Sequence, residues 1–356
     1  MNLTVDKLMK CLPLPLLCTA LLLGAIACQQ PNPKNESASS SSAGLPGEGK
    51  AVQGVHANLP EEEFQTAIVN KALEKLGYEV EEPEIVTPAI SFVALANGDV
   101  DYTAIHLERL HAKFYEKNGG AEKLVKSGVI ISGLVQSYQI DKKTAKEYNI
   151  TSLEQFKDPE IAKLFDSDRD GKADLAGCPV GWGCELAIEH HLDAYDLRDT
   201  VEHNQGEYNL IIADTITRYK EGESVLFYTW EPLWVGQVLK PGEDTIRLEV
   251  PYTDLPEEQG EMSEKDTTAK GKNLGFAIDR YWITANKEFA DANPAAKKLF
   301  ELIKIPVEDM SAASQRIKEG ENSPEEIISL AEEWIGTNQE TFDSWIEEAK
   351  QVNSEN

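Results

Sequence analysis

Residues 177–187 read Gly177-Cys-Pro-Val-Gly-Trp-Gly-Cys-Glu-Leu-Ala187, and the rest of the chain is organised around this turn. Trp182 lies between two glycines, inside the gap between Cys178 and Cys184. A large ring is therefore held on a short loop whose neighbours have no side chains. The pattern of residues 185–195 predicts a helix, and the N–H groups at a helix start attract an anion. This turn thus offers an aromatic face, which suits a cation, beside a cradle for an anion.

A second ring, Trp230, closes the apolar run of residues 225–228, which we interpret as a strand. With the backbone N–H groups of Gly183 and Cys184 as anion donors, the two rings predict a site for a small zwitterion. The alternative interpretation is that Gly-Trp-Gly is an ordinary tight turn and that both tryptophans are core residues.

The first 27 residues have the pattern of a secretory signal: Lys7 and Lys10 precede an apolar run that ends in small residues before Cys28. The ending resembles a bacterial lipoprotein signal, in which the cysteine is lipidated; plain cleavage near Ala27 is the alternative. Residues 28–49 are rich in Ser, Pro, Asn and Gly, which is typical of a flexible tether. We therefore expect an exported protein, periplasmic or on the outer face of the cytoplasmic membrane, held by a lipid anchor at Cys28.

The composition is strongly acidic, with 62 Asp and Glu against 34 Lys and Arg, a net charge of −28. Such a charge argues against nucleic acid as a partner. The sequence contains no Gly-rich phosphate loop, no Gly-x-Ser-x-Gly elbow and no Ser/His/Asp or Cys/His set with supporting spacing. The pair His190-His191 does not fit a zinc motif, and we expect it on the surface. We therefore predict that the protein is not an enzyme.

Of the five cysteines, only Cys178 and Cys184 lie beyond the signal region. In an exported protein such a pair favours a disulfide. The alternative is a pair of metal ligands, but no other cysteine and no histidine motif completes a zinc site.

Strand-like and helix-like segments alternate from residue 51 onward, which predicts an α/β sheet. Ligands in such sheets bind beyond the carboxyl ends of strands. We predict a strand at residues 100–105 and a helix at 110–117, so that His106, Leu107 and His111 lie just past a strand end. Leu107 and His111 have helical spacing and can face one cleft. Two histidines at this place suit a catalytic or metal-binding role; the alternative is that they are polar surface groups.

An acidic segment precedes the central turn: Asp166, Asp168, Asp170 and Asp174, with Gly171, match the opening of a calcium loop. The twelfth position is a glycine, where a bidentate glutamate is expected. A structural calcium ion is therefore a hypothesis, the alternative is an Asp/Gly turn, and we expect no other cofactor.

From about Leu59 to its end the chain resembles the glycine betaine/proline betaine-binding proteins (ProX-like) that serve ProU-type ABC importers. The resemblance is carried by many collinear segments. Among them are Glu63-Phe-Gln-Thr, Ala72-Leu-Glu-Lys-Leu-Gly-Tyr, Ile140-Asp-Lys-Lys-Thr-Ala, Asp170-Gly-Lys-Ala-Asp-Leu-Ala-Gly-Cys, Gly181-Trp-Gly-Cys-Glu, His203-Asn-Gln-Gly and Tyr228-Thr-Trp.

The resemblance implies a two-lobed, type II-like periplasmic-binding-protein fold, with a ligand cleft between lobes joined by a hinge of two crossing strands. We place lobe 1 in residues 50–138 and 282–356 and lobe 2 in residues 139–281. The expected function is that of an extracytoplasmic substrate-binding subunit of an importer for glycine betaine/proline betaine-type compatible solutes, used in osmoprotection. The implied partners are a small quaternary-ammonium zwitterion, the ABC permease and its ATPase subunit.

The resemblance also implies a cage of three tryptophans around the quaternary ammonium, and Trp182 and Trp230 match two of them. It assigns the carboxylate contacts to the N–H groups of Gly183 and Cys184 and to His111, and it implies the Cys178–Cys184 disulfide.

The third cage tryptophan falls on Leu107, and the neighbouring Glu108 and Arg109 also depart from the family pattern. A leucine packs on methyl groups but offers no π face, so the missing ring should weaken binding by about 1–2 kcal/mol. The alternative ligand is therefore another small zwitterion or quaternary amine, such as choline or ectoine.

Overall fold

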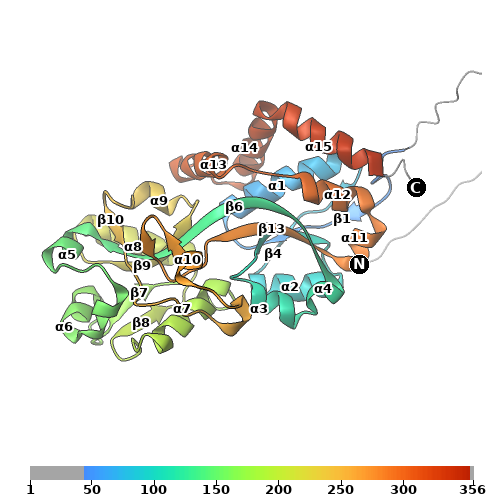
Figure 1. Cartoon of the computed structure of the whole chain (residues 1–356). Helices are drawn as coiled ribbons and strands as arrows, with labels where there is room; N and C mark the ends of the chain where they lie inside the picture. Colours follow the sequence, from blue (N-terminus) through green and yellow to red (C-terminus); the bar gives the residue numbers. More distant parts are fainter. Residues whose placement is uncertain (1–43, 353–356) are drawn as a thin grey trace, which may run out of the picture. The chain divides into compact units, whose positions relative to one another are not determined.

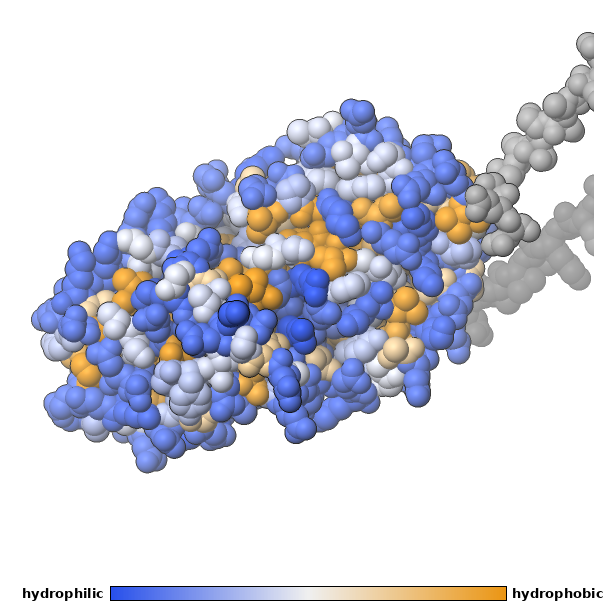
Figure 2. Space-filling view, in the orientation of Figure 1, coloured by the Kyte–Doolittle hydropathy of each residue, from blue (hydrophilic) through white to orange (hydrophobic). Residues whose placement is uncertain are grey.

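The computed structural model describes residues 44–352 (Figure 1). The signal, the candidate lipidation site Cys28 and most of the tether lie outside these residues, so those expectations stay predictions. Within residues 44–352, none of the helices combines the length and the apolar character needed to span a membrane. Hydrophilic side chains cover most of the face shown in Figure 2, as the acidic composition leads one to expect.

A mixed seven-stranded sheet runs through the described residues in the order β5-β13-β6-β9-β7-β8, with β10 added to β6. Its strands are β5 (Tyr102–Leu107), β6 (Leu124–Asp141), β7 (Ala173–Ala176), β8 (Val201–Asn204), β9 (Leu226–Glu231), β10 (Thr245–Arg247) and β13 (Asp279–Asn286). Three two-stranded ladders pair β1 (Ala51–Val52) with β3 (Glu79–Val80), β2 (Val55–His56) with β4 (Glu84–Ile85) and β11 (Thr268–Ala269) with β12 (Lys272–Asn273).

The helices lie between and after these strands. They are α1 (Pro60–Lys75), α2 (Pro88–Asn97), α3 (Ala112–Lys117), α4 (Gly120–Lys123), α5 (Lys142–Glu147), η1 (Leu153–Lys157), α6 (Pro159–Ala162), η2 (Lys163–Phe165), α7 (Gly183–Ala194), α8 (Tyr208–Glu221), α9 (Val235–Val238), η3 (Glu257–Gln259), α10 (Glu264–Thr267), α11 (Lys287–Ala292), α12 (Pro294–Leu302), α13 (Val307–Glu319), α14 (Pro324–Thr337) and α15 (Gln339–Gln351).

The 18-residue strand β6 passes through both halves of the sheet. Its residues up to Leu134 pair antiparallel with β13, and from Val135 onward it pairs with β9 and β10. β6 and β13 run side by side between the two groups of elements in Figure 1. Two neighbouring strands therefore connect the two halves, although the expected lobe boundaries themselves stay a prediction.

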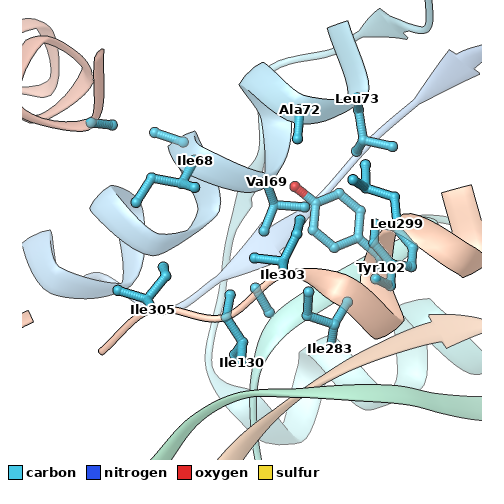
Figure 3. Close-up of a cluster of buried hydrophobic side chains, with 14 of the residues drawn as sticks. Ile68, Val69, Ala72, Leu73, Tyr102, Ile130, Ile283, Leu299, Ile303 and Ile305 are labelled. Atoms are coloured by element: carbon cyan, nitrogen blue, oxygen red, sulfur yellow. The ribbon is translucent and has the colours of Figure 1, made fainter. Parts of the chain in front are cut away.

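Two large hydrophobic clusters flank this connection. The first buries α1 and the C-terminal helices against β5, β13 and the first part of β6. Figure 3 shows its centre, where Val69, Tyr102, Ile130 and Ile283 converge from four different elements. The second cluster is built by residues of β7, β8, β9, α7 and α8. Each cluster can hold a compact unit together, because apolar burial contributes about 25 cal/mol per Å² of surface.

Local signals in the sequence explain where the principal helices begin and end. α1 begins with Pro60 and three glutamates, which suit the free N–H groups and the dipole of a first turn. α2 ends at Asn97 and is followed by Gly98 as its C-cap, whose φ of 78° is readily reached only without a side chain. α14 begins with a capping box between Ser323 and Glu326.

The structure corrects the predicted elements around residue 107. β5 continues through Leu107, and α3 begins only at Ala112, so His106 and Leu107 lie on the strand rather than past its end. His111 stands at the N-cap of α3, and its N–H donates to the carbonyl of Leu107 at 3.0 Å. A tight turn, not a helix, therefore brings Leu107 and His111 together.

Candidate functional site

A cavity of about 30 Å³, measured as the space open to the centres of water molecules, lies where the two large clusters meet. One wall comes from the β5–α3 turn, β6 and β13, and the other from the start of α7 and from β9. Its lining residues are Ala57, Glu62, Pro88, Leu107, Leu110, His111, Leu134, Gln136, Trp182, Gly183, Cys184, Tyr228, Trp230 and Tyr281. The structure thus brings all six residues of the expected binding site into one cavity.

Trp182 and Trp230 form a corner of two aromatic walls. Their ring centroids are 6.1 Å apart, and the ring planes meet at 61°. Behind the corner, Tyr208 of α8 lies 6.0 Å from Trp182 and 4.9 Å from Trp230, and its hydroxyl donates to Oγ1 of Thr229 at 3.1 Å. Tyr208 is fully buried, so it supports the two rings rather than facing the cavity.

The sequence of the turn explains how Trp182 is presented. Gly181 has a φ of 89°, and Trp182 then adopts an extended conformation as the N-cap of α7. α7 begins at Gly183, two residues earlier than predicted, and its N-cap provides no side-chain hydrogen bond. The first N–H groups of α7, at Gly183 and Cys184, therefore stay available at the cavity wall, where the helix dipole favours an anion.

His111 faces the same cavity as a neutral hydrogen-bond donor. Its side chain is buried, and burial lowers the pKa of His111 to about 3. Nδ1 accepts a hydrogen bond from the N–H of Leu107 at 3.3 Å, so in the neutral ring the proton is carried by Nε2. One Nε2–H donor and two helix N–H donors form stronger hydrogen bonds with a carboxylate than with an uncharged acceptor.

Two polar residues of the cavity could not be found from the sequence. Oε2 of Glu62 accepts the N–H of Ala57 at 2.8 Å, and burial, with the charge of Glu61 beside it, raises the pKa of Glu62 to about 8. Oε1 of Gln136 accepts the hydroxyl of Tyr228 at 2.6 Å, whereas its Nε2 has no hydrogen-bond partner among the described residues. Acids and amides are common in this sequence, so no local pattern marks these two.

The pKa of Glu62 leads to a test of stability against pH. Folding raises this pKa from 4.5 to about 8, so the neutral carboxyl stabilises the fold below pH 4.5, and this contribution is lost as the pH rises to about 8. We expect the melting temperature of the ligand-free protein to fall over this range, and to fall less in Glu62→Gln. Thermal denaturation measures this, with the exposed Glu84→Gln as the matched control. Equal pH slopes in Glu62→Gln and wild type would contradict the assignment.

The expected disulfide is confirmed: Cys178 is bonded to Cys184, with Cα atoms 6.0 Å apart. The N–H of Cys178 donates to Nε2 of His203 at 2.9 Å, and Nδ1 of His203 contacts Glu189 at 2.8 Å. The disulfide and this histidine together hold the loop that carries Trp182 against β8 and α7.

Loss of the disulfide should lower stability. Closing so short a loop restricts the unfolded chain by about 2 kcal/mol. We therefore expect a reductant to lower the free energy of unfolding by about this amount, measured by chemical denaturation. The double variant Cys178→Ala/Cys184→Ala is the control, because it should have the lower stability with or without reductant. A reductant effect of equal size in that variant would contradict the explanation.

Asp166, Asp168 and Asp170 lie in the bent segment that leads into β7, and Asp174 lies on β7 itself. Oxygens of Asp166, Asp168 and Asp174 lie within 4.8 Å of one another, and those of Asp168 and Asp170 approach Glu202 of β8 in the same way. Backbone N–H groups also donate hydrogen bonds to these carboxylates. Oδ2 of Asp166, for example, accepts the N–H of Gly171 at 2.9 Å. Calcium binding here stays a prediction. Calorimetric titration of chelator-treated protein should give heat with calcium, and an Asp168→Asn variant should give less; no heat would contradict it.

The structure also places His191 and Arg109. His191 is fully buried, and Nδ1 of its ring contacts the hydroxyl of Tyr138 at 2.8 Å, so the prediction of a surface position was wrong. Arg109 does not line the cavity: its Nη1 donates to the carbonyl of Gln259 at 3.3 Å. The change from the family pattern at Arg109 therefore adds no positive charge to the site.

Hydrogen bonds join the two sides of the cavity beyond its lining. The N–H of Ala89, at the start of α2, donates to the carbonyl of Gly181 at 3.1 Å. The N–H of Trp234 donates to Oε1 of the buried Glu61 at 3.1 Å, and Nδ2 of Asn209 donates to the carbonyl of Asn58 at 3.3 Å. The described conformation is therefore closed over the cavity.

Comparison with known proteins places this architecture in a family. Residues 51–337 match the substrate binding domain of ABC-type glycine betaine transport systems. The chain is 48% identical over 307 residues to the glycine betaine-binding periplasmic protein OusX of Dickeya dadantii, covering 86% of this chain and 92% of the relative. It is 46% identical over 312 residues to the glycine betaine/proline betaine-binding periplasmic protein of Salmonella typhimurium, covering 88% and 94%.

A solved structure confirms the fold. The glycine betaine, L-proline-binding protein ProX of Borrelia burgdorferi superposes with a TM-score of 0.66 at 20% identity, covering 85% of this chain and 99% of that one. The expected α/β fold of type II periplasmic binding proteins is thereby confirmed. The chain belongs to the family of substrate-binding domains of ABC-type glycine betaine transport systems, and it is a binding protein rather than an enzyme.

Proposed function

We propose that this chain binds a quaternary-ammonium zwitterion of the glycine betaine and proline betaine class and presents it to an ABC permease for import as a compatible solute. The observation that carries the proposal is the pairing of two features in one cavity. An aromatic corner of Trp182 and Trp230 lies beside the start of α7 and His111. The first feature suits a cation without N–H groups, and the second suits a carboxylate.

The chemistry of such a ligand matches the two sides of the cavity. A trimethylammonium group cannot donate conventional hydrogen bonds, so aromatic faces are its natural partners. The attraction reaches about 2 kcal/mol when water is excluded. The carboxylate, about two bonds away, accepts from the N–H groups of Gly183 and Cys184 and from Nε2 of His111. Because His111 is neutral, it adds no charge to the closed cavity. The positive and negative groups of the zwitterion then balance each other.

The two hydrophobic clusters support the proposed division into lobe 1 (residues 50–138 and 282–356) and lobe 2 (residues 139–281). β6 and β13 cross between them and are the proposed hinge. Closure over a bound ligand would let the permease and its ATPase distinguish loaded from empty protein, because the ligand stabilises the closed state by its differential affinity.

We also propose that the protein works outside the cytoplasm, in the periplasm or on the outer face of the cytoplasmic membrane. The signal-like N-terminus supports export, and relatives in this family are named periplasmic proteins. The lipoprotein-like sequence before Cys28 supports an anchor there. Mass spectrometry of the exported protein tests this, and an unmodified N-terminus would contradict the anchor.

A second candidate ligand class follows from Leu107, which occupies the cavity where the family cage has a tryptophan. Another small zwitterion or quaternary amine, such as choline or ectoine, is this alternative. Calorimetry of the purified protein with glycine betaine, proline betaine, choline and ectoine decides between the two. We expect both betaines to bind most tightly; tighter binding of choline or ectoine would favour the alternative, and no binding of either betaine would overturn the proposed function.

A further inference from the structure

The side of the cavity that lacks the expected third tryptophan holds a different aromatic ring. Leu107 of β5 pairs in register with Tyr281 of β13, across an antiparallel ladder. Residues directly opposite each other in such a ladder point to the same face of the sheet. Both side chains accordingly line the same cavity. The residue that replaces the expected ring thus has a tyrosine as its immediate cross-strand neighbour.

The local strand geometry is irregular at this residue. Along β13, the register with β6 shifts between Asp279 and Arg280 and again between Tyr281 and Trp282. Such irregularities bend a strand and re-aim a side chain, and they are frequent beside binding sites. Tyr281 is only 6% exposed and is packed into the first hydrophobic cluster, so its ring is held in place before a ligand arrives.

We propose that Tyr281 is a ligand-contacting residue that provides the third aromatic wall around the quaternary ammonium, in place of the ring absent at Leu107. This inference rests on the proposed function. Trp182 and Trp230 both come from the side of the cavity built by α7 and β9, whereas Tyr281 lines the cavity from β13, beside β5. Tyr228 also lines the cavity, but it precedes Trp230 on the same strand and therefore adds to a wall that already exists.

The electrostatic surroundings suit this role. Burial and the nearby carboxyls of Glu62, Asp279 and Glu61 raise the pKa of Tyr281, so its ring remains a neutral phenol. A neutral phenol ring presents a negative face to a cation, more weakly than an indole but as a true π partner, which leucine is not. The site would therefore retain three aromatic walls with a different third member.

The alternative is that Tyr281 only fills the core beneath the site. A pair of ligands with the same shape, of which only one carries the cation, distinguishes the two roles. Glycine betaine carries the cation, whereas 3,3-dimethylbutanoate has the same shape and carboxylate with a carbon in place of the nitrogen. A ring acting through its π face favours glycine betaine, and a ring acting as filler favours neither. Calorimetry with both ligands should be performed on wild type, Tyr281→Leu, Tyr281→Phe, Leu107→Trp and the double variant Leu107→Trp/Tyr281→Leu.

We expect Tyr281→Leu to weaken glycine betaine binding roughly tenfold, with a much smaller effect on 3,3-dimethylbutanoate. Tyr281→Phe, which keeps the ring, should retain most of the affinity. Leu107→Trp/Tyr281→Leu should recover most of the loss, because the ring returns from the neighbouring strand. Tyr78→Leu is the matched control: this tyrosine is buried in the same cluster but does not line the cavity, so its loss should lower the melting temperature without this selectivity change.

Equal losses for both ligands in Tyr281→Leu, or no loss for either, would overturn the inference. So would a double variant that binds no better than Tyr281→Leu. If wild type binds glycine betaine, Trp182→Ala does not, and Tyr281→Leu binds as wild type does, this inference alone fails. A folded wild type that binds no quaternary ammonium overturns the proposed function and the inference together.

Discussion

Trp182→Ala is expected to lower the affinity for glycine betaine about a hundredfold or more, and Trp230→Ala should do the same. Each substitution removes one wall of the corner, worth about 2 kcal/mol for a desolvated cation. It also removes an edge-to-face contact at 6.1 Å and a contact to Tyr208, so the remaining ring loses its support. Together these losses exceed the roughly 2.7 kcal/mol that corresponds to a hundredfold change.

Calorimetry on the folded variants measures the effect, and thermal denaturation without ligand verifies the fold. The matched control is Trp334→Ala. That ring stacks on Trp345 at 6.2 Å in the C-terminal helices and lies outside the cavity. It should reduce stability and leave affinity unchanged. Wild-type affinity in both Trp182→Ala and Trp230→Ala would show that the tryptophans are core residues and that the ligand binds elsewhere.

The part of the site that is continuous in sequence could be predicted from the sequence. The ring of Trp182, the helix start behind it and the bond between Cys178 and Cys184 all lie within one short segment, where spacing determines geometry. Trp230 could be predicted because it ends a recognisable strand. The α/β class followed equally well from the alternation of strand-like and helix-like segments.

The other wall could not be predicted, because it depends on how distant strands align. Tyr281 is near Leu107 only through the register of β13 with β5, and a shift of one residue would turn Tyr281 to the other face. Gln136 and Glu62 reach the cavity in the same way, from β6 and α1. The surface position predicted for His191 was wrong for a related reason. The hydroxyl of Tyr138, far away in sequence, contacts its ring and makes its burial possible.

Gly183→Ala is expected to weaken ligand binding by about tenfold to a hundredfold while slightly stabilising the ligand-free protein. A Cβ atom at this position would lie 2.4 Å from the carbonyl oxygen of Leu110 and 2.9 Å from Cδ2 of His111. The β5–α3 turn cannot easily yield, because Asp279 accepts the N–H groups of Arg109 and Leu110 at 3.1 and 3.0 Å. Overpacking of this kind destabilises the closed arrangement by roughly 1–3 kcal/mol.

Gly183→Ala should weaken ligand binding but should not lower the stability of the ligand-free protein, and these opposite effects distinguish it from a variant that is simply unstable. Within α7 alone, alanine is favoured over glycine by up to about 1 kcal/mol, so a protein that opens by hinge motion should melt no lower than wild type. In the proposed division, Gly183 and Leu110 lie on different lobes, and only closure brings them together.

Gly336→Ala is the matched control. This glycine lies in α14 with nothing within 4 Å of an added Cβ, so the substitution should stabilise the fold without affecting affinity. Small-angle scattering with glycine betaine should show compaction of wild type and Gly336→Ala at ligand concentrations that leave Gly183→Ala open. If Gly183→Ala closes and binds as wild type does, then the start of α7 does not need its close contact with the β5–α3 turn. In that case the carboxylate cradle must be formed by other groups.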